Sequence, residues 1–440
     1  MKAPKKIRVS ESASWPLIPL KRYCKIFGRI GFRGYTINDI VEEGDGALSL
    51  SPGNIYNDQL TYSSKTFISW EKYDESPEIK VQVGDILFVK TGSTIGKVAY
   101  VDTMGEPMTV NPQLVVLKEL DLYPKYLYYS LCSKFSKEQV ASTNAGGATP
   151  ALSQEELGLI SINVPPTTEL QTLIARYLDQ KTSQIDALIE QKEKLLKLLT
   201  EKRTAIITQA VTKGLDPDVE MKDSGIDWLG EIPKEWEVKK VKFLTNKVKT
   251  GTTPSSNGPD YFTDGEIYWY NPGDFNYDSV ELADAKRKIQ KQFFEDSNVA
   301  KYPEGSVLIV GIGATLGKVA VSKLTSYSNQ QINAIYPTPK FDSYYLAYTL
   351  SSLVEVLKVY SNATTLGIMN QDKTKNFTIP YPEKKEQERI VAYIDKVDKE
   401  TVKILTKTKS SIGKLKEYRE ALITSAVTGQ IDVRKEVTDE

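Results

Sequence analysis

The sequence predicts an α+β protein in which two similar β-rich α/β domains are joined by two long helices that form an antiparallel coiled coil. Three observations predict this fold: an internal repeat along the whole chain, short strand-like runs in each half, and a heptad-spaced segment at the end of each half. The chain has 440 residues, too many for one ordinary core, since a domain usually holds about 100–200 residues.

The repeat is clearest in a glycine-rich segment. Residues 83–99 read VGDILFVKTGSTIGKVA and residues 304–320 read EGSVLIVGIGATLGKVA. Two further pairs follow, Asn111-x-Gln113 with Asn329-x-Gln331 and Ala210-Val211-Thr212 with Ala426-Val427-Thr428. Matches over this length indicate a duplication, and we expect the two halves to be related by a pseudo-twofold axis.

Each half predicts a β-rich domain followed by a helix. Short apolar runs bounded by Gly, Pro and Asn predict strands, at 86–90, 98–101, 114–117 and 307–310. A shorter helix is expected at 124–138 and at 343–359. We place the domains at 1–165 and 215–382, and the helical segments at 166–214 and 383–440.

The long helices are predicted by their caps and their spacing. Thr168-Glu169-Leu170-Gln171 has the capping-box pattern, and Gly214 and Gly429 lie near the expected ends. The apolar stripes predict a seam made of Ile174, Leu178, Ile185, Leu188, Leu195, Leu199 and Ile206 in the first helix, and of Ile390, Ile394, Val397, Ile404, Ile412, Leu415 and Leu422 in the second. The alternative is that each stripe packs against its own domain.

The amino-acid composition excludes several classes of catalytic and metal-binding site. The chain has no histidine, which excludes the histidine-based triads, His metal ligands and imidazole acid–base catalysis. Two cysteines exclude a disulfide framework and fit a reducing cytoplasm. We see no signal peptide and expect no membrane association. The 57 basic and 57 acidic residues balance, so any contact with nucleic acid must be local.

No segment of the sequence matches the residue spacing of a known P-loop or amino-methyltransferase motif, and a nuclease motif is matched only loosely. The loop Gly92–Lys97 lacks the first glycine and the Ser/Thr that a phosphate-binding P-loop requires, because Thr91 and Val98 stand there. No Asn/Asp-Pro-Pro-aromatic segment of an amino-methyltransferase is present. A nuclease pattern can be assembled only loosely, from Pro259-Asp260 and Asp284-Ala285-Lys286.

The glycine-rich loops and two aromatic, amide-rich stretches are candidates for DNA contact. Glycine lets the backbone approach a partner, hydroxyls and Lys bond phosphate, and Asn, Arg and Asp read base edges. The alternative is a structural role as a tight hairpin, as core aromatics and as turn formers. The candidates are Arg33, Tyr35, Asn38, Thr91, Ser93, Thr94, Lys97, Trp269, Asn271, Asp274, Asn276, Thr315 and Lys318.

One segment resembles a known family. Residues 224–236, SGIDWLGEIPKEW, are similar to the opening of target-recognition domains in type I restriction–modification specificity subunits, and the glycine-rich loops and helix starts resemble that family too. The first domain lacks the full lead-in, since it begins near Trp15 with WPLIPL.

The resemblance implies a non-catalytic subunit of the cytoplasm that binds double-stranded DNA. Each domain would read half of a bipartite site, and the helices would set the spacer and dock two methyltransferase subunits. Motor–endonuclease subunits would join that core. The chain itself would bind no cofactor and no metal, since S-adenosylmethionine, ATP and Mg belong to the partner subunits. Two other functions stay open, a self-contained DNA nuclease or modification enzyme and a scaffold that does not bind DNA.

Overall fold

The computed structural model describes residues 15–29, 34–143, 150–245, 247–276, 279–361 and 367–434. The chain divides into two compact units. The first unit holds Met1–Lys192 with Ser410–Glu440, and the second unit holds Glu193–Lys409. This division shares each long helix between the two units, whereas the sequence predicts the helices as separate segments.

The first unit contains two four-stranded sheets that enclose a core. One sheet has the order β10-β4-β7-β3 and the other β2-β11-β8-β9. Their bounds are β2 Lys25–Gly28, β3 Ile40–Val41, β4 Gly46–Leu50, β7 Phe67–Ser69, β8 Ile86–Val89, β9 Val98–Tyr100, β10 Met108–Val110 and β11 Leu114–Lys118. Leu48, Leu87 and Val116 are fully buried between the sheets. Two short pairs complete the unit, β1 (Leu17–Pro19) with β12 (Ser161–Asn163) and β5 (Ile55–Tyr56) with β6 (Gln59–Leu60).

The second unit repeats this plan with different strand lengths. A five-stranded sheet has the order β16-β23-β20-β21-β18, and a three-stranded sheet has the order β19-β17-β22. Their bounds are β16 Val248–Thr250, β17 Ile267–Tyr270, β18 Glu281–Leu282, β19 Lys288–Ile289, β20 Val307–Val310, β21 Val319–Ser322, β22 Ser326–Ser328 and β23 Ile332–Ile335. Two antiparallel pairs border them, β13 (Met221–Asp223) with β14 (Glu231–Pro233) and β15 (Glu237–Lys240) with β24 (Thr378–Tyr381).

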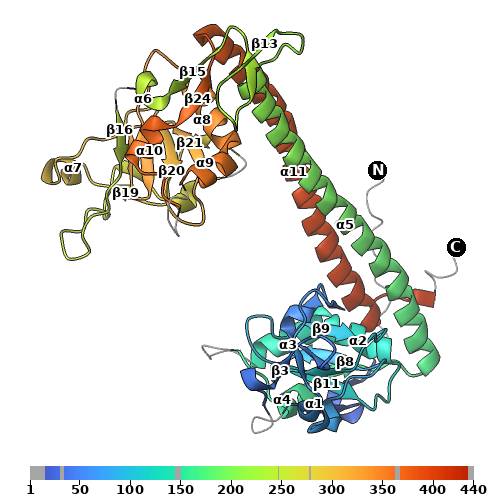
Figure 1. Cartoon of the computed structure of the whole chain (residues 1–440). Coiled ribbons are helices and arrows are strands. Elements are labelled where there is room, and N and C mark those ends of the chain that lie inside the picture. The colour runs from blue at the N-terminus through green and yellow to red at the C-terminus, as the bar shows by residue number, and fades with distance from the viewer. Residues whose placement is uncertain are drawn as a thin grey trace. The chain divides into compact units, whose positions relative to one another are not determined.

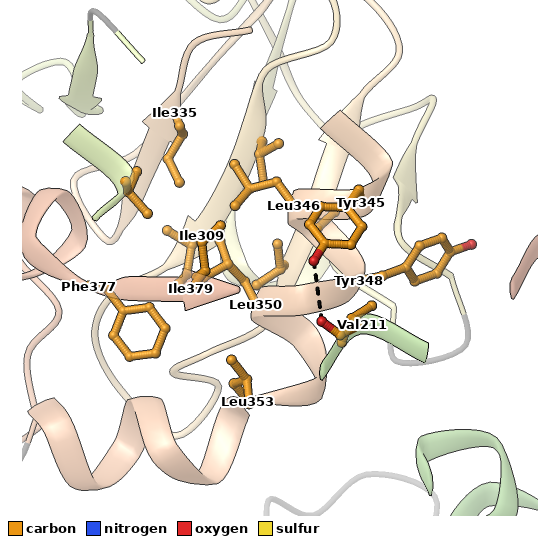
Figure 2. Packing of buried hydrophobic residues seen from close by; sticks show 14 of the residues in the cluster. Val211, Ile309, Ile335, Tyr345, Leu346, Tyr348, Leu350, Leu353, Phe377 and Ile379 are labelled. Carbon is orange, nitrogen blue, oxygen red and sulfur yellow. Dashed lines mark hydrogen bonds between the residues drawn. The ribbon is translucent and has the colours of Figure 1, made fainter. Parts of the chain in front are cut away.

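Short helices cover the sheets in both units. They are α1 Trp70–Asp74, α2 Pro124–Cys132, α3 Lys134–Thr143 and α4 Gln154–Leu159 in the first unit, and α6 Val241–Leu244, α7 Gln292–Asp296, α8 Ser343–Ser352, α9 Val354–Ser361 and α10 Gln371–Asn376 in the second. Figure 2 shows Tyr345, Leu346 and Leu350 of α8 packed among Ile309, Ile335 and Ile379, with Val211 of the first long helix on the same cluster. The second unit therefore shares its core with the helix.

The two long helices are α5 (Thr168–Lys213) and α11 (Lys384–Val427), drawn in green and red in Figure 1. In the first unit, Arg419 of α11 binds Asp186 of α5 with Nε–Oδ1 and Nη2–Oδ2 distances of 2.9 and 3.1 Å. In the second unit, Arg203 of α5 binds Asp398 of α11 with an Nη2–Oδ2 distance of 2.9 Å. The beginning of each helix thus lies beside the end of the other, and the predicted antiparallel pairing is confirmed within each unit.

The seam differs from the prediction at three positions. Leu188, Leu195 and Ile404 are 39%, 43% and 46% exposed. Of the residues that follow them, Ile189 and Leu405 are buried and Leu196 is half-buried. At each of these positions two apolar residues are adjacent in the sequence, so hydrophobicity alone does not show which of them faces the partner helix. Polar residues also occupy seam positions at heptad spacing, namely Thr182, Arg203, Asp398, Thr408 and Arg419. Ile174, Leu178, Ile185, Ile390, Ile394, Ile412 and Leu422 are buried, and Leu199, Ile206, Val397 and Leu415 are half-buried.

Equivalent tyrosines fasten the helices to the globular parts. The hydroxyl of Tyr126 in α2 donates to the carbonyl of Asn163, before α5, and to that of Val427, at the end of α11. In the second unit, the hydroxyl of Tyr345 donates to the carbonyls of Pro380 and Val211 in the same way. Each globular part therefore holds the start of its own helix and the end of the other one.

The described residues contain neither a membrane-spanning helix nor a cluster of metal ligands. No helix among them is long and apolar enough to cross a membrane. Within the same residues, no group of three or more Cys, Asp or Glu side chains is placed to hold a metal ion. The thiols of Cys24 and Cys132 are unpaired and buried, and burial raises the pKa of Cys24 to about 12.

Candidate nucleic-acid interface

The glycine-rich loops form the same tight hairpin in both units. The amide of Val89 donates to the Lys97 carbonyl and the amide of Gly96 to the Val89 carbonyl, both at 2.9 Å. In the second unit, Val310, Lys318 and Gly317 make the same two bonds at 2.8 and 2.9 Å. The four loop glycines, Gly92, Gly96, Gly313 and Gly317, have φ between 86° and 99°. A side chain would strain the backbone there, so the glycines are required by the hairpin itself.

A proline–glycine turn lies beside each hairpin. The turns are the 3-10 segments Pro52–Asn54 and Pro272–Asp274. Each is closed by the side chain at its end, because the Asn54 amide oxygen accepts from the amide of Ser51 at 2.9 Å and the Asp274 carboxylate accepts from that of Asn271 at 2.7 Å. The internal repeat does not reveal this pair of turns, because the two turns have only their Pro and Gly residues in common.

A lysine links each hairpin to its turn. Lys97 Nζ donates to the carbonyl of Ile55 at 3.4 Å, and Lys318 Nζ donates to the carbonyl of Phe275 at 3.0 Å. These are the residues that directly follow the two turns. The lysines therefore hold the site together, as a structural role for the hairpin requires, and they remain close to any ligand placed on it.

An Asn-x-Gln segment completes each site. The side chain of Asn111 bonds Gln113 at 3.2 Å, and that of Asn329 bonds Gln331 at 3.0 Å. A Cβ built on Gly92 would lie 3.6 Å from Gln113 Nε2, so the amide sits directly under the hairpin. The second unit adds a bond from Asn329 Nδ2 to Asn271 Oδ1 at 3.2 Å, which connects the segment to the turn.

Turn, hairpin and glutamine together line a hollow in the first unit. Its volume is about 430 Å³, and it is lined by Ser51, Pro52, Gly53, Ile55, Tyr56, Thr91, Gly92, Ser93, Thr94, Lys97 and Gln113. The lining offers hydroxyl, amide and ammonium groups beside exposed glycine backbone. Groups of these kinds bind phosphate oxygens and the edges of bases in other proteins.

The structure brings most of the candidates to these two sites. Thr91, Ser93, Thr94 and Lys97 line the first hollow. Thr315, Lys318, Asn271 and Asp274 take the equivalent places in the second unit, and the exposed Asn276 follows the turn. Trp269 is only 3% exposed and belongs to the second core, where its ring meets that of Phe262 edge to face. A ring enclosed in this way cannot contact a base, so we assign Trp269 to the core.

Tyr35 and Asn38 lie away from the hollow. Asn38 is exposed in the turn Ile37–Asp39, whose cap is Thr36, and two hydrogen bonds from Thr36 hold the pKa of Asp39 below its usual value. Tyr35 lies 5.7 Å from the guanidinium of Arg29, which is bound to the carbonyl of Val110. Burial lowers the pKa of Arg29. Arg33 lies outside the described residues.

Known proteins are similar to this chain in sequence and in fold. Residues 47–198 and 233–414 match the family model "Type I restriction modification DNA specificity domain". The type I restriction enzyme MjaIX specificity subunit of Methanocaldococcus jannaschii is 31% identical over 184 residues, which span 41% of each chain. The putative MjaX specificity subunit of the same organism is 23% identical over 373 residues, or 82% of each chain.

A solved structure supports the fold. Its description reads "Structural basis underlying complex assembly and conformational transition of the type I R-M system". One of its chains superimposes on this chain with a TM-score of 0.69 at 16% sequence identity. The match covers 96% of this chain and 100% of that one. Because the family model matches two regions that make up most of the sequence, the chain belongs to the type I restriction modification DNA specificity domain family and carries its domain twice.

Proposed function

We propose that this chain is the specificity subunit of a type I restriction–modification complex and that each globular part reads one half of a split DNA site. One observation carries the proposal: the same framework of hairpin, turn and glutamine occurs twice, with different side chains on it. Ser51 and Asn54 of the first turn stand where Asn271 and Asp274 stand in the second. Two such surfaces on one chain fit an asymmetric target, because hydroxyl, amide and carboxylate groups select different base edges.

The paired helices would set the spacing of the two half-sites. A helix of 46 residues is about 69 Å long at roughly 1.5 Å per residue. Because α5 and α11 both continue from one unit into the other, their length enters the path between the two reading surfaces. The spacer that is not read would follow from that length.

The helices would also dock the partner subunits. In the second unit, Leu195, Leu198 and Ile404 are each more than two fifths exposed on the long helices. Leu195 and Leu198 are one helical turn apart, and neighbouring exposed apolar side chains of this kind would suit a protein partner. The partners would be two methyltransferase subunits, with motor–endonuclease subunits joining them, and these would bring S-adenosylmethionine, ATP and Mg. This chain would supply specificity and no catalysis.

The test is selection from a library of duplexes carrying 30 randomised base pairs, with the full chain bound to the methyltransferase subunits of its system. We expect a bipartite motif, two short conserved blocks around a spacer of fixed length. One contiguous motif, or no motif, would contradict the proposal. Cleavage or methylation of DNA by the chain alone would favour a self-contained enzyme instead.

A matched pair of variants sharpens this test. Thr94 and Thr315 occupy the same place in the two hairpins. Thr94→Ala should alter only one block of the selected motif and Thr315→Ala only the other, because each threonine lies in a different unit. The two variants are each other's controls. If both changed the same block, or both blocks equally, the assignment of one half-site to each unit would be wrong.

A further inference from the structure

A basic segment borders the reading surface of the second unit. Lys286, Arg287 and Lys288 are all exposed. The segment is joined to the proline–glycine turn, because the amide of Lys286 donates to Asp274 Oδ1 at 3.3 Å. These cations add positive charge next to the turn, on a chain whose net charge is zero. Such a surface suits the DNA backbone and bases.

The first unit has the same backbone here with different side chains. In the second unit, the amide of Trp269 in β17 donates to the carbonyl of Arg287 at 3.1 Å. In the first unit, the amide of Ser49 in β4 donates to the carbonyl of Thr66 at 2.8 Å. The neighbouring registers agree, since Tyr268 pairs with Lys288 as Leu48 pairs with Phe67. Arg287 therefore stands where the first unit has Thr66.

The guanidinium of Arg287 rests on aromatic rings. Its Cζ lies 3.6 Å from the ring centroid of Phe262 and 5.4 Å from that of Trp269. The two rings meet edge to face with centroids 4.8 Å apart. Stacking of this kind holds the planar group by its face, which restricts its rotation while its N–H edges stay accessible.

The support beneath Arg287 is itself fixed. Asp260 accepts from the amide of Phe262 at 2.9 Å and from the hydroxyl of Thr263 at 2.6 Å. These contacts hold the pKa of Asp260 below its usual value. The hydrogen bond from the Thr263 side chain has the largest effect, followed by the bond from the Phe262 amide, and the nearby charge of Arg287 adds a smaller one. The indole of Trp269 donates to the carbonyl of Thr252 at 3.3 Å. Among the described residues, the Arg287 guanidinium has no hydrogen-bond or ion-pair partner.

We propose that Arg287 reads a guanine in the half-site of the second unit, by donating two hydrogen bonds from its guanidinium to O6 and N7. The proposal rests on the function proposed above. A fixed, stacked guanidinium with its donors unused matches the acceptor pair of guanine in the major groove. Thr66 cannot form this pair of bonds, so the two half-sites should differ at the corresponding base.

The test repeats the selection from 30 randomised base pairs with four forms of the full chain and its methyltransferase subunits. The unaltered chain should select a bipartite motif with a required guanine in the block that Thr315→Ala alters. Arg287→Ala should relax that one position by about 10- to 100-fold in relative affinity, and leave the other block and the spacer unchanged. Arg287→Lys keeps the positive charge but loses the two parallel N–H donors of the guanidinium, so it should relax the same position.

The matched control is Lys291→Ala. Lys291 is exposed in the same unit and pairs with Glu266 at 2.9 Å, so this variant removes one charge and should keep the motif. Phe262→Leu, which removes the stacking surface, should weaken the same position less than Arg287→Ala. The inference is overturned if the block holds no required guanine, if Arg287→Ala keeps the full motif, or if Arg287→Lys matches the unaltered chain. Loss of the bipartite motif in the unaltered chain would instead overturn the proposed function.

Discussion

At the scale of single residues, two partly buried arginines fix how the long helices align. Arg203 and Arg419 hold equivalent places in the repeat, and each reaches a carboxylate on the opposite helix, Asp398 and Asp186 respectively. An arginine in a coiled-coil seam tolerates only an alignment that brings it a carboxylate. A shifted alignment would leave the charge buried and unpaired. The ion pairs therefore select one register where apolar contacts alone would permit several.

We expect Arg203→Ala to lower the free energy of unfolding by about 3 kcal/mol, because Asp398 would be left without its partner in the seam. The exchange Arg203→Asp with Asp398→Arg should recover part of that loss by restoring the pair. Urea unfolding followed by circular dichroism measures both. The control is Lys197→Ala, which removes an exposed pair with Glu201 and should cost less than about 1 kcal/mol. Equal losses for Arg203→Ala and Lys197→Ala would show that the pair does not set the alignment.

The same residues explain why the sequence predicted the helices well and their seam less well. The heptad spacing was visible in Leu178, Ile185 and Ile206, so the helices and their pairing followed from it. At Leu188, Leu195 and Ile404 the next residue is also apolar, so hydrophobicity alone does not show which of the two faces the partner helix. Only the partner helix shows that Arg203 is paired and inside, and the partner's alignment is a contact between residues far apart in the chain.

At the scale of elements, Tyr126 and Tyr345 each join a short helix to the segment before one long helix and to the end of the other long helix. We call each of these tyrosines, with its two hydrogen bonds, a tyrosine clamp. Tyr126 holds the end of α11 and Tyr345 the end of α5. The side chains of Gln171 and Gln387 add equivalent bonds, to the amides of Tyr123 and Asp342 at 2.9 and 2.8 Å. These bonds link helices to globular parts without a flexible joint in either unit.

Removing one clamp hydroxyl should loosen one helix end. We expect Tyr126→Phe to speed hydrogen exchange in the last turns of α11, and Tyr345→Phe to do so in the last turns of α5. Each variant should lose about 1–2 kcal/mol of local stability, because the helix carbonyl loses a buried donor. Hydrogen exchange with mass spectrometry resolves the two ends. Tyr418→Phe, exposed on α11, is the control. Faster exchange at both ends in either variant would contradict the local role of each clamp.

The elements of the reading surface were predicted in part. The glycine-rich hairpins stood out because four positive-φ glycines repeat at one spacing. The turn at Pro52–Asn54 did not, since its counterpart Pro272–Asp274 shares too few letters to be aligned without the strands beside it. Arg287 was missed for a similar reason. Its guanidinium is held by stacking on Phe262 and Trp269, and these contacts exist only in the folded sheet.

At the scale of the whole molecule, the two units have two helices in common. The unit boundary falls after Lys192 in α5 and after Lys409 in α11. Each of these points lies near the middle of its own helix. A change of length made at both points keeps every ion pair and clamp described above, because it alters no contact within a unit.

We therefore expect that seven residues inserted at both points will lengthen the selected spacer by about three base pairs. Seven helical residues add about 10.5 Å, and duplex DNA rises about 3.4 Å per base pair. A seven-residue insertion keeps the heptad frame, whereas four residues shift the seam to another face. Selection from 30 randomised base pairs reports the spacer and both blocks together. The seven-residue variant should keep both blocks, and the four-residue variant should lose affinity. A spacer that stays constant after the seven-residue insertion would show that the helices do not set the distance between the half-sites.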